Sequence, residues 1–190
     1  MHPQLARIVA DLESAVERVR QLDASLTHYA WNVQPEPARW SAAECVAHLN
    51  LTTEALLPLV RSALRDARDR QERTPARYRR NVLGWLAWKI VAPGGGLRTK
   101  TIAAFMPSPT PPVQDLVSNF IRLQNDVISC VREADGLPLE HVNVRSPFHG
   151  RMTYNLYAAL TLVPRHQHRH LHQAERAAQA YAPSAMVAAV

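Results

Sequence analysis

Four long stretches of the chain place apolar residues at intervals of three and four, and proline-rich segments separate them. This period is typical of amphipathic helices that bury one face. We expect helices at about 3–30, from 41 into an arginine-rich segment, at 110–136 with Gly136 near its end, and at 153–181. No segment alternates with a period of two for long enough to predict a strand. The sequence therefore predicts an all-α protein, a four-helix bundle with a long connection between its second and third helices.

Several residues mark the expected starts of these helices. Ser41 and Glu44 have the spacing of a capping box, in which the serine accepts an amide hydrogen bond and the glutamate reaches back. Thr110 and Pro111 are the residue types favoured at an N-cap and in a first helical turn. Thr153 is expected to cap the fourth helix in the same way.

The length of the chain suits one domain with a proper core, so we expect a single domain over residues 1–190 whose end, 182–190, is frayed. The apolar runs are far shorter than the roughly 20 residues of a membrane-spanning helix. The N-terminus lacks the apolar core of a signal peptide, which predicts a cytoplasmic protein. Cys45 and Cys130 have no nearby cysteine partner, so we expect buried small side chains rather than a disulfide or a cysteine-based zinc site.

Residues 74–112 form the long connection, and residues 81–92 within it have the composition of a short helix. A proline and three glycines at 93–96 are expected to end that helix. Trp85 and Trp88 allow two interpretations. They could wall an apolar substrate pocket, or they could belong to an amphipathic helix that packs on the bundle, which is the interpretation we favour.

The net charge of +6 is concentrated in residues 61–80, where eight arginines accompany three acidic residues. Opposite charges there have helical spacing, as in Arg65 and Asp69, which is typical of a solvated helix face. The alternative is a surface for nucleic acid or an anionic membrane. No helix-turn-helix, RNP-type or zinc-finger pattern supports a nucleic-acid partner, so the solvated face is favoured. The role of the arginine-rich and tryptophan-containing stretch 61–112 stays open.

Four of the nine histidines cluster near the end of the chain, and two pairs among them have the spacing of one helical turn. At about 100° per residue, His166 and His170 lie on the apolar side of the expected helix. His168 and His172 lie with arginines toward the charged side. We therefore expect the first pair to face the interior. His48, on the apolar face of the second helix, is the best candidate for a third converging histidine.

Three converging imidazoles could bind one divalent ion such as zinc, nickel or iron. The alternative is a set of core histidines that find hydrogen-bond partners, and spacing alone leaves both possibilities open. Three histidine ligands leave positions for water or substrate, the arrangement of a catalytic metal. Pro58 and Pro164 are expected to bend the second and fourth helices, the latter just before His166.

Three short motifs occur in an informative order: WSAAECVAHL at 40–49, FHGRMT at 148–153 and HQHRHLHQ at 166–173. The first resembles the W-S-x-x-E-x-x-x-H-L start of the second helix in the DinB/YfiT-like superfamily. The others resemble the entry to its last helix and its H-x-x-R-H-x-x-Q signature. The resemblance covers essentially the whole chain and implies an up-down-down-up four-helix bundle, often a dimer. It also implies a metal ion bound by the three matching histidines: His48, His166 and His170.

The resemblance implies two enzyme classes, metal-dependent hydrolases and transferases that join a low-molecular-weight thiol to an electrophile. Glu44 could be a general base or a partner of His48, although its capping-box role is favoured. Gln173 could orient a ligand or a metal-bound water. The expected partners are a small-molecule substrate, such as a thiol, and a second copy of the chain. The alternatives are a non-catalytic, stress-related bundle that binds a metal or small ligand, and a nucleic-acid-binding protein that uses residues 61–80.

Overall fold

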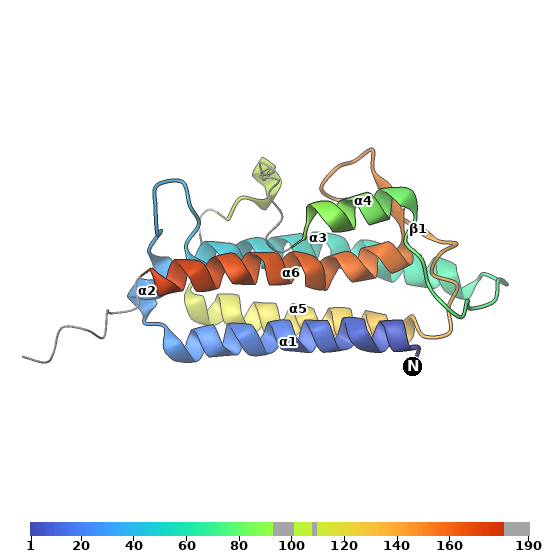
Figure 1. Cartoon of the computed structure of the whole chain (residues 1–190), viewed down its shortest axis with the longest axis horizontal. Helices are drawn as coiled ribbons and strands as arrows, with labels where there is room; N and C mark the ends of the chain where they lie inside the picture. Colours follow the sequence, from blue (N-terminus) through green and yellow to red (C-terminus); the bar gives the residue numbers. More distant parts are fainter. Residues whose placement is uncertain (93–100, 108–109, 181–190) are drawn as a thin grey trace, which may run out of the picture.

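The protein is mostly helical, and the computed structural model describes residues 1–92, 101–107 and 110–180 (Figure 1). Its elements in chain order are α1 (Pro3–Ser25), α2 (His28–Asn32), α3 (Ala42–Arg68), α4 (Val82–Ile90), the 3₁₀ helix η1 (Ala103–Phe105), α5 (Val113–Glu133), β1 (Asn143–Arg145), β2 (Thr153–Asn155) and α6 (Leu156–Gln179). The prediction of a helical protein is confirmed. The prediction of no strand is wrong, because β1 and β2 pair antiparallel. Each has three residues, too few to show an alternating pattern in the sequence.

The four long helices α1, α3, α5 and α6 lie side by side (Figure 1). Helices α1 and α3 each pack against both α5 and α6. The short helix α4 covers α6 and β2 on the side away from α1 (Figure 1). The site described below lies on α3 and α6, so their mutual packing is what positions it.

The long helices form because each presents a continuous apolar face. In α1 the buried side chains recur every three or four residues: Leu5, Ile8, Val9, Leu12, Ala15, Val16, Val19 and Leu22. Leu5 and Leu12 are fully buried. Truncating either to alanine should cost about 2–5 kcal/mol, the usual range for a buried leucine.

The first expected helix is divided in two, which corrects the prediction of one helix over 3–30. Helix α1 ends at Ser25, and Leu26 has an extended backbone. Thr27 then caps α2, because its side chain accepts a hydrogen bond from the backbone amide of Ala30. A threonine side chain that bonds its own backbone in this way favours a new helix start over a continued helix.

Two other helix starts differ from the sequence-based expectations. Pro112, rather than Thr110, is the N-cap of α5. The reason is that Pro111 precedes another proline, which disfavours the helical conformation for it. Asn155, rather than Thr153, caps α6 by accepting a hydrogen bond from the amide of Ala158. Thr153 instead pairs in the small sheet.

Other boundaries agree with expectation. Ser41 and Glu44 form the predicted capping box at the start of α3. Gly136 follows the end of α5 with a φ of 81°, a left-handed conformation that glycine adopts without strain. Pro58 and Pro164 lie inside α3 and α6, both of which continue past them, and the bends expected there stay predictions. The expected helix end at 93–96 and the expected frayed tail at 182–190 lie outside the described residues.

Both cysteines are buried thiols without a disulfide, as expected. Burial raises the pKa of Cys45 to about 12, so this side chain behaves as a small apolar group. Within the ranges that the structure covers, no helix has both the length and the apolar character required to cross a bilayer.

The arginine-rich segment makes ion pairs with α5 rather than only along its own helix. Arg61 contacts Asp126 at 3.0 Å, and Arg68 contacts Glu133 at 2.7 Å. Helix α3 ends at Arg68, so the later arginines of this segment do not continue a helix face. These pairs are half-exposed, and each contributes about 1 kcal/mol or less.

Candidate metal centre

The structure brings together the three histidines that were expected to converge. His48 comes from α3, and His166 and His170 come from α6. Their nearest ligand atoms all lie within 4.8 Å of one another. The ring centroids of His48 and His170 are 4.6 Å apart, as are those of His166 and His170. Nitrogen atoms at this spacing can reach a common metal ion.

The other histidine pair lies elsewhere, as the helix-face argument requires. His168 faces α1, where its Nδ1 accepts a hydrogen bond from Arg18 and its Nε2 donates to the carbonyl oxygen of Asp11. Arg18 also forms a two-bond ion pair with Glu175. His172 is exposed. About two turns of α6 therefore hold two histidine pairs with separate environments, one against α3 and one toward α1 and solvent.

A backbone carbonyl orients His48. Its Nδ1 lies 2.8 Å from the carbonyl oxygen of Phe105 in η1, and because a carbonyl can only accept, Nδ1 must carry the proton. This hydrogen bond leaves the lone pair on Nε2 of the neutral ring. A ligating histidine is usually held by such a second hydrogen bond, which fixes both its tautomer and its ring orientation.

The electrostatic environment keeps all three imidazoles neutral. Burial lowers the pKa of His48, lowers that of His166 well below its ordinary value, and lowers that of His170 to about 3. The neighbouring histidines and Arg169 lower the pKa of His166 further. Metal ions bind the unprotonated ring, so this environment removes proton competition at neutral pH.

One ring nitrogen in the cluster lacks a partner. The Nδ1 atom of His170 is buried, and no described residue forms a hydrogen bond with it. A buried polar atom without a partner is costly and uncommon. Gln173 lies one turn further along α6, and its side chain acts to raise the pKa of His170. The donor set and the orphaned nitrogen fit a metal ion held by the three rings.

Aromatic side chains surround the histidines. The Trp40 ring lies 4.8 Å from that of His48 and 5.8 Å from that of His170. Phe148 lies 6.3 Å from His166 and also contacts Phe105 at 4.9 Å. Trp40 and Phe148 belong to motifs quoted above, but nothing in the sequence assigned them to the site. Phe105 lies in the long connection, where no sequence pattern pointed to it.

Glu44 does not contact the histidines in any hydrogen bond of the described residues. Its carboxylate accepts from the backbone amide of Ser41 at 2.7 Å and from the side chain of Gln34 at 3.0 Å. Both bonds belong to the start of α3. The geometry supports the capping-box interpretation over that of a general base.

Trp85 and Trp88 follow the favoured interpretation of a short helix that packs on the long ones. Trp88, on the inner side of α4, is partly buried against the core, and the guanidinium of Arg165 lies 3.4 Å from its ring centroid. Trp85 is exposed on the outer side of α4. The aromatic residues beside the histidine cluster are therefore Trp40 and Phe148, and not Trp85 or Trp88.

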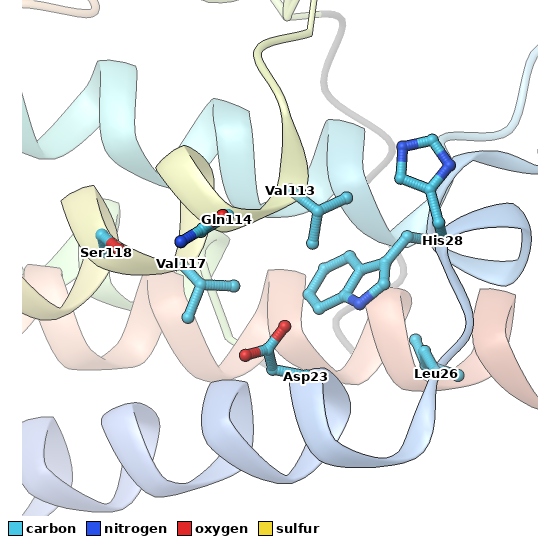
Figure 2. A pocket seen from close by; sticks show the side chains of 8 residues that line it. Asp23, Leu26, His28, Val113, Gln114, Val117 and Ser118 are labelled. Atoms are coloured by element: carbon cyan, nitrogen blue, oxygen red, sulfur yellow. The ribbon is translucent and has the colours of Figure 1, made fainter.

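A separate hollow lies where α1, α2 and α5 meet (Figure 2). Trp31, Val113 and Asp23 are among the residues that line it. The Trp31 ring nitrogen is buried without a hydrogen-bond partner among the described residues. None of the three clustered histidines lines this hollow, so it is distinct from the candidate metal centre.

Comparisons with known proteins agree with the geometry. No curated protein and no solved structure matches the chain. A family model described as the DinB superfamily matches residues 11–174, a range that contains all three clustered histidines. The match covers most of the 190 residues. The chain belongs to the DinB superfamily.

Proposed function

We propose that this protein is a metal-dependent thiol S-transferase with a single four-helix-bundle domain. In this proposal His48, His166 and His170 hold one divalent ion, and a low-molecular-weight thiol is the nucleophilic substrate. The observation that carries the metal site is the hydrogen bond from His48 to Phe105, together with two further neutral imidazoles within ligating reach. A set of core histidines with satisfied hydrogen bonds would not leave the buried Nδ1 atom of His170 without a partner among the described residues.

A divalent ion on three histidines would have an open position, where it lowers the pKa of a bound thiol or water and so supplies a nucleophile at neutral pH. The thiol would form a bond from sulfur to an electrophilic carbon, whose leaving group departs with the electron pair of the broken bond. The thiol proton would be released to solvent. No redox partner is required.

The surroundings favour a thiol over water as the nucleophile. Among the described residues, the charged groups that shift the pKa values of the three histidines are the histidines themselves and Arg169. None of these groups is a carboxylate. Hydrolysis commonly uses a positioned acid or base beside the metal, whereas a coordinated thiol loses its proton without one. The aromatic rings of Trp40 and Phe148 suit an apolar electrophile. A metal-dependent hydrolase is the second candidate.

Two nearby residues have supporting roles in this proposal. Gln173 is a positioning residue, because its side chain lies one turn from His170 and acts on the pKa of that ring. It is also exposed, so it can meet a substrate that approaches from solvent. Glu44 keeps its structural role at the start of α3.

The first experiment is elemental analysis of protein made without a histidine tag. The parent should retain about one equivalent of zinc, nickel or iron, and His48→Ala, His166→Ala and His170→Ala should each lose it while keeping their helical content. His168→Ala and His172→Ala are matched controls from the same helix, with the same spacing between them, and should keep the metal. Loss of metal in the controls, or none in the reconstituted parent, would contradict the metal site.

The second experiment separates the two enzyme classes. The metal-loaded protein is incubated with an aromatic halide and a small thiol, and both thioether formation and halide release are followed. The same preparation is tested against activated esters and amides. Thioether formation lost in His48→Ala supports the transferase, while ester or amide cleavage with the same dependence supports the hydrolase.

The alternative to an enzyme is a non-catalytic bundle that binds a metal or a small ligand. Retention of the metal without turnover of any tested substrate would favour this alternative. The homodimer and the cytoplasmic location remain predictions. Sedimentation analysis of the full chain tests the homodimer.

A further inference from the structure

Positive charge is segregated along the sequence into two segments. Residues 73–114 contain seven lysines and arginines and no acidic residue, and residues 141–174 contain four and none. The remainder of the chain has eleven basic and sixteen acidic residues, so it is net negative. The net charge of +6 therefore conceals a strong asymmetry.

The fold places the described parts of these two segments against each other. Helix α4 lies in the first segment and packs on β2, which lies in the second, and on α6, most of which lies in the second (Figure 1). Two acidic groups border this layer: Glu140, which accepts from the backbone amide of Arg79, and Glu175, which lies on α6 just beyond the second segment and pairs with Arg18 of α1. On the opposite side, α1 and α5 carry much of the acidic remainder. The described residues around α4 thus carry more basic than acidic side chains, which makes this side of the protein cationic.

The cationic side also exposes large apolar side chains. Four residues on the outer surface of α4 are open to solvent: Val82 at 79%, Leu83 at 42%, Trp85 at 51% and Leu86 at 44%. The Lys89 ammonium lies 5.7 Å from the Trp85 ring centroid. Clustered exposed apolar side chains, unlike single ones, mark an interaction surface.

Helix α4 is held firmly enough to present this surface. Gly84 faces α6, where a side-chain carbon would meet the Cβ of Ala158 at 2.3 Å. Two arginines of α6 satisfy carbonyl oxygens near the end of α4: Arg165 donates to Trp88 at 2.7 Å and Arg169 donates to Ile90 at 2.8 Å. The exposed apolar face is therefore a fixed feature of the folded chain.

We propose that the outer face of α4, formed by Val82, Leu83, Trp85, Leu86 and Lys89, docks on an anionic lipid surface. The apolar side chains enter the boundary between headgroups and acyl chains, and the surrounding cations attract the lipid phosphates. A helix that combines tryptophan and leucine on one face with flanking lysine and arginine has the chemistry of interfacial binding.

Charge and hydrophobicity together favour this partner over two others. Nucleic acid would use the cations but gain little from exposed valine and leucine, because the contacts to its backbone are mainly ionic. A second copy docked through α4 would bring two cationic surfaces together, and their repulsion opposes that contact. An anionic bilayer satisfies both the charge and the apolar side chains.

The test is co-sedimentation of the full chain with vesicles of phosphatidylcholine and phosphatidylglycerol, compared with phosphatidylcholine alone. We expect binding to the anionic vesicles that weakens as salt is added. Trp85 emission should shift to shorter wavelength on binding, and Trp85→Phe should remove that change. The affinity of the double variant Leu83→Ser/Leu86→Ser for anionic vesicles should fall by about tenfold or more, because both apolar anchors are lost. Lys89→Glu should weaken binding by roughly fivefold or more.

Matched controls distinguish this face from general surface effects. Tyr29→Ser removes an exposed aromatic residue from α2, and Arg7→Glu reverses an exposed charge on α1. Both should bind anionic vesicles as the parent does. All variants keep buried residues intact, and circular dichroism confirms that each is folded.

Three outcomes would overturn the proposal. The first is equal binding to neutral and anionic vesicles, or none to either. The second is tight binding to duplex DNA that Leu83→Ser/Leu86→Ser leaves unchanged while vesicles are ignored. The third is a dimer in sedimentation analysis that this double variant converts to a monomer without vesicle binding, which would identify a second copy as the occupant. The metal analysis above is independent of all three.

Discussion

The Nδ1 atom of His48 donates a hydrogen bond to the carbonyl oxygen of Phe105 across 2.8 Å, joining α3 to the short helix η1 in the long connection. Phe105 is itself buried and packs against Phe148. The connection therefore takes part in the candidate metal centre, although none of its described residues belongs to the histidine cluster. The orientation of His48 depends on how this turn packs.

The first prediction concerns Phe105. Replacing Phe105 with alanine keeps the carbonyl group but removes the packing that positions it. Metal affinity, measured by competition with a chelator, should fall by about 10–100-fold, the usual effect of losing an outer partner of a ligand. Ile102→Ala is the control, because Ile102 is exposed at the start of the same turn. Unchanged affinity in Phe105→Ala would show that His48 is oriented by other contacts.

The stability of the metal-free protein should depend on pH through the clustered histidines. Their folded pKa values are lowered, so below about pH 6.5 the unfolded chain binds protons that the folded chain does not. The free energy of unfolding should therefore fall as pH decreases, by about 1.4 kcal/mol per pH unit for each histidine that stays neutral. For His170 this loss continues down to about pH 3.

Chemical denaturation with chelator present between pH 7 and pH 5 measures this slope, in a range above most carboxyl titrations. His170→Gln removes one of the contributing groups and should give a shallower dependence. His172→Gln, an exposed position on the same helix, should leave the slope as in the parent. A parent protein whose stability is flat over this range would contradict burial of the cluster.

Adding a single methyl group at Gly84 should push α4 away from α6. In Gly84→Ala the new Cβ would lie 2.3 Å from the Cβ of Ala158, so one helix has to move. We expect a loss of about 1–3 kcal/mol in the free energy of unfolding, the usual cost of overpacking. Gly150→Ala is the matched control, because nothing lies within 4 Å of its added carbon. Equal stability of the two variants would mean that α4 is loosely attached.

The contact between Arg18 and Glu175 should be sensitive to arginine geometry. Arg18 makes two parallel bonds of 2.7 Å to Glu175 and a third to His168. Lysine keeps the charge but cannot form this fork, so Arg18→Lys should lose about 1 kcal/mol of stability. Arg132→Lys, whose partner Glu13 is 3.9 Å away and exposed, should change nothing measurable. Thermal denaturation at low and high salt makes the comparison.

Much of the site followed from local periodicity. The apolar neighbours of His166 and His170 on α6 distinguish this pair from His168, because a helix repeats its faces regardless of the rest of the fold. His48 could be placed in the same way on α3. The capping box of Ser41 and Glu44 is equally local, since all of its atoms lie within four residues.

Other features of the fold and of the site depend on contacts between residues far apart in the sequence, and only the tertiary structure decided them. The partner of His48 is a carbonyl 57 residues away, and a backbone oxygen leaves no mark in a sequence. Asn155 replaced Thr153 as the cap of α6 because β2 uses Thr153 to pair with Arg145. The sequence alone determines which side chains share a helix face. Which faces meet, and which backbone groups complete a site, depends on packing between distant segments, and that packing is a property of the whole chain.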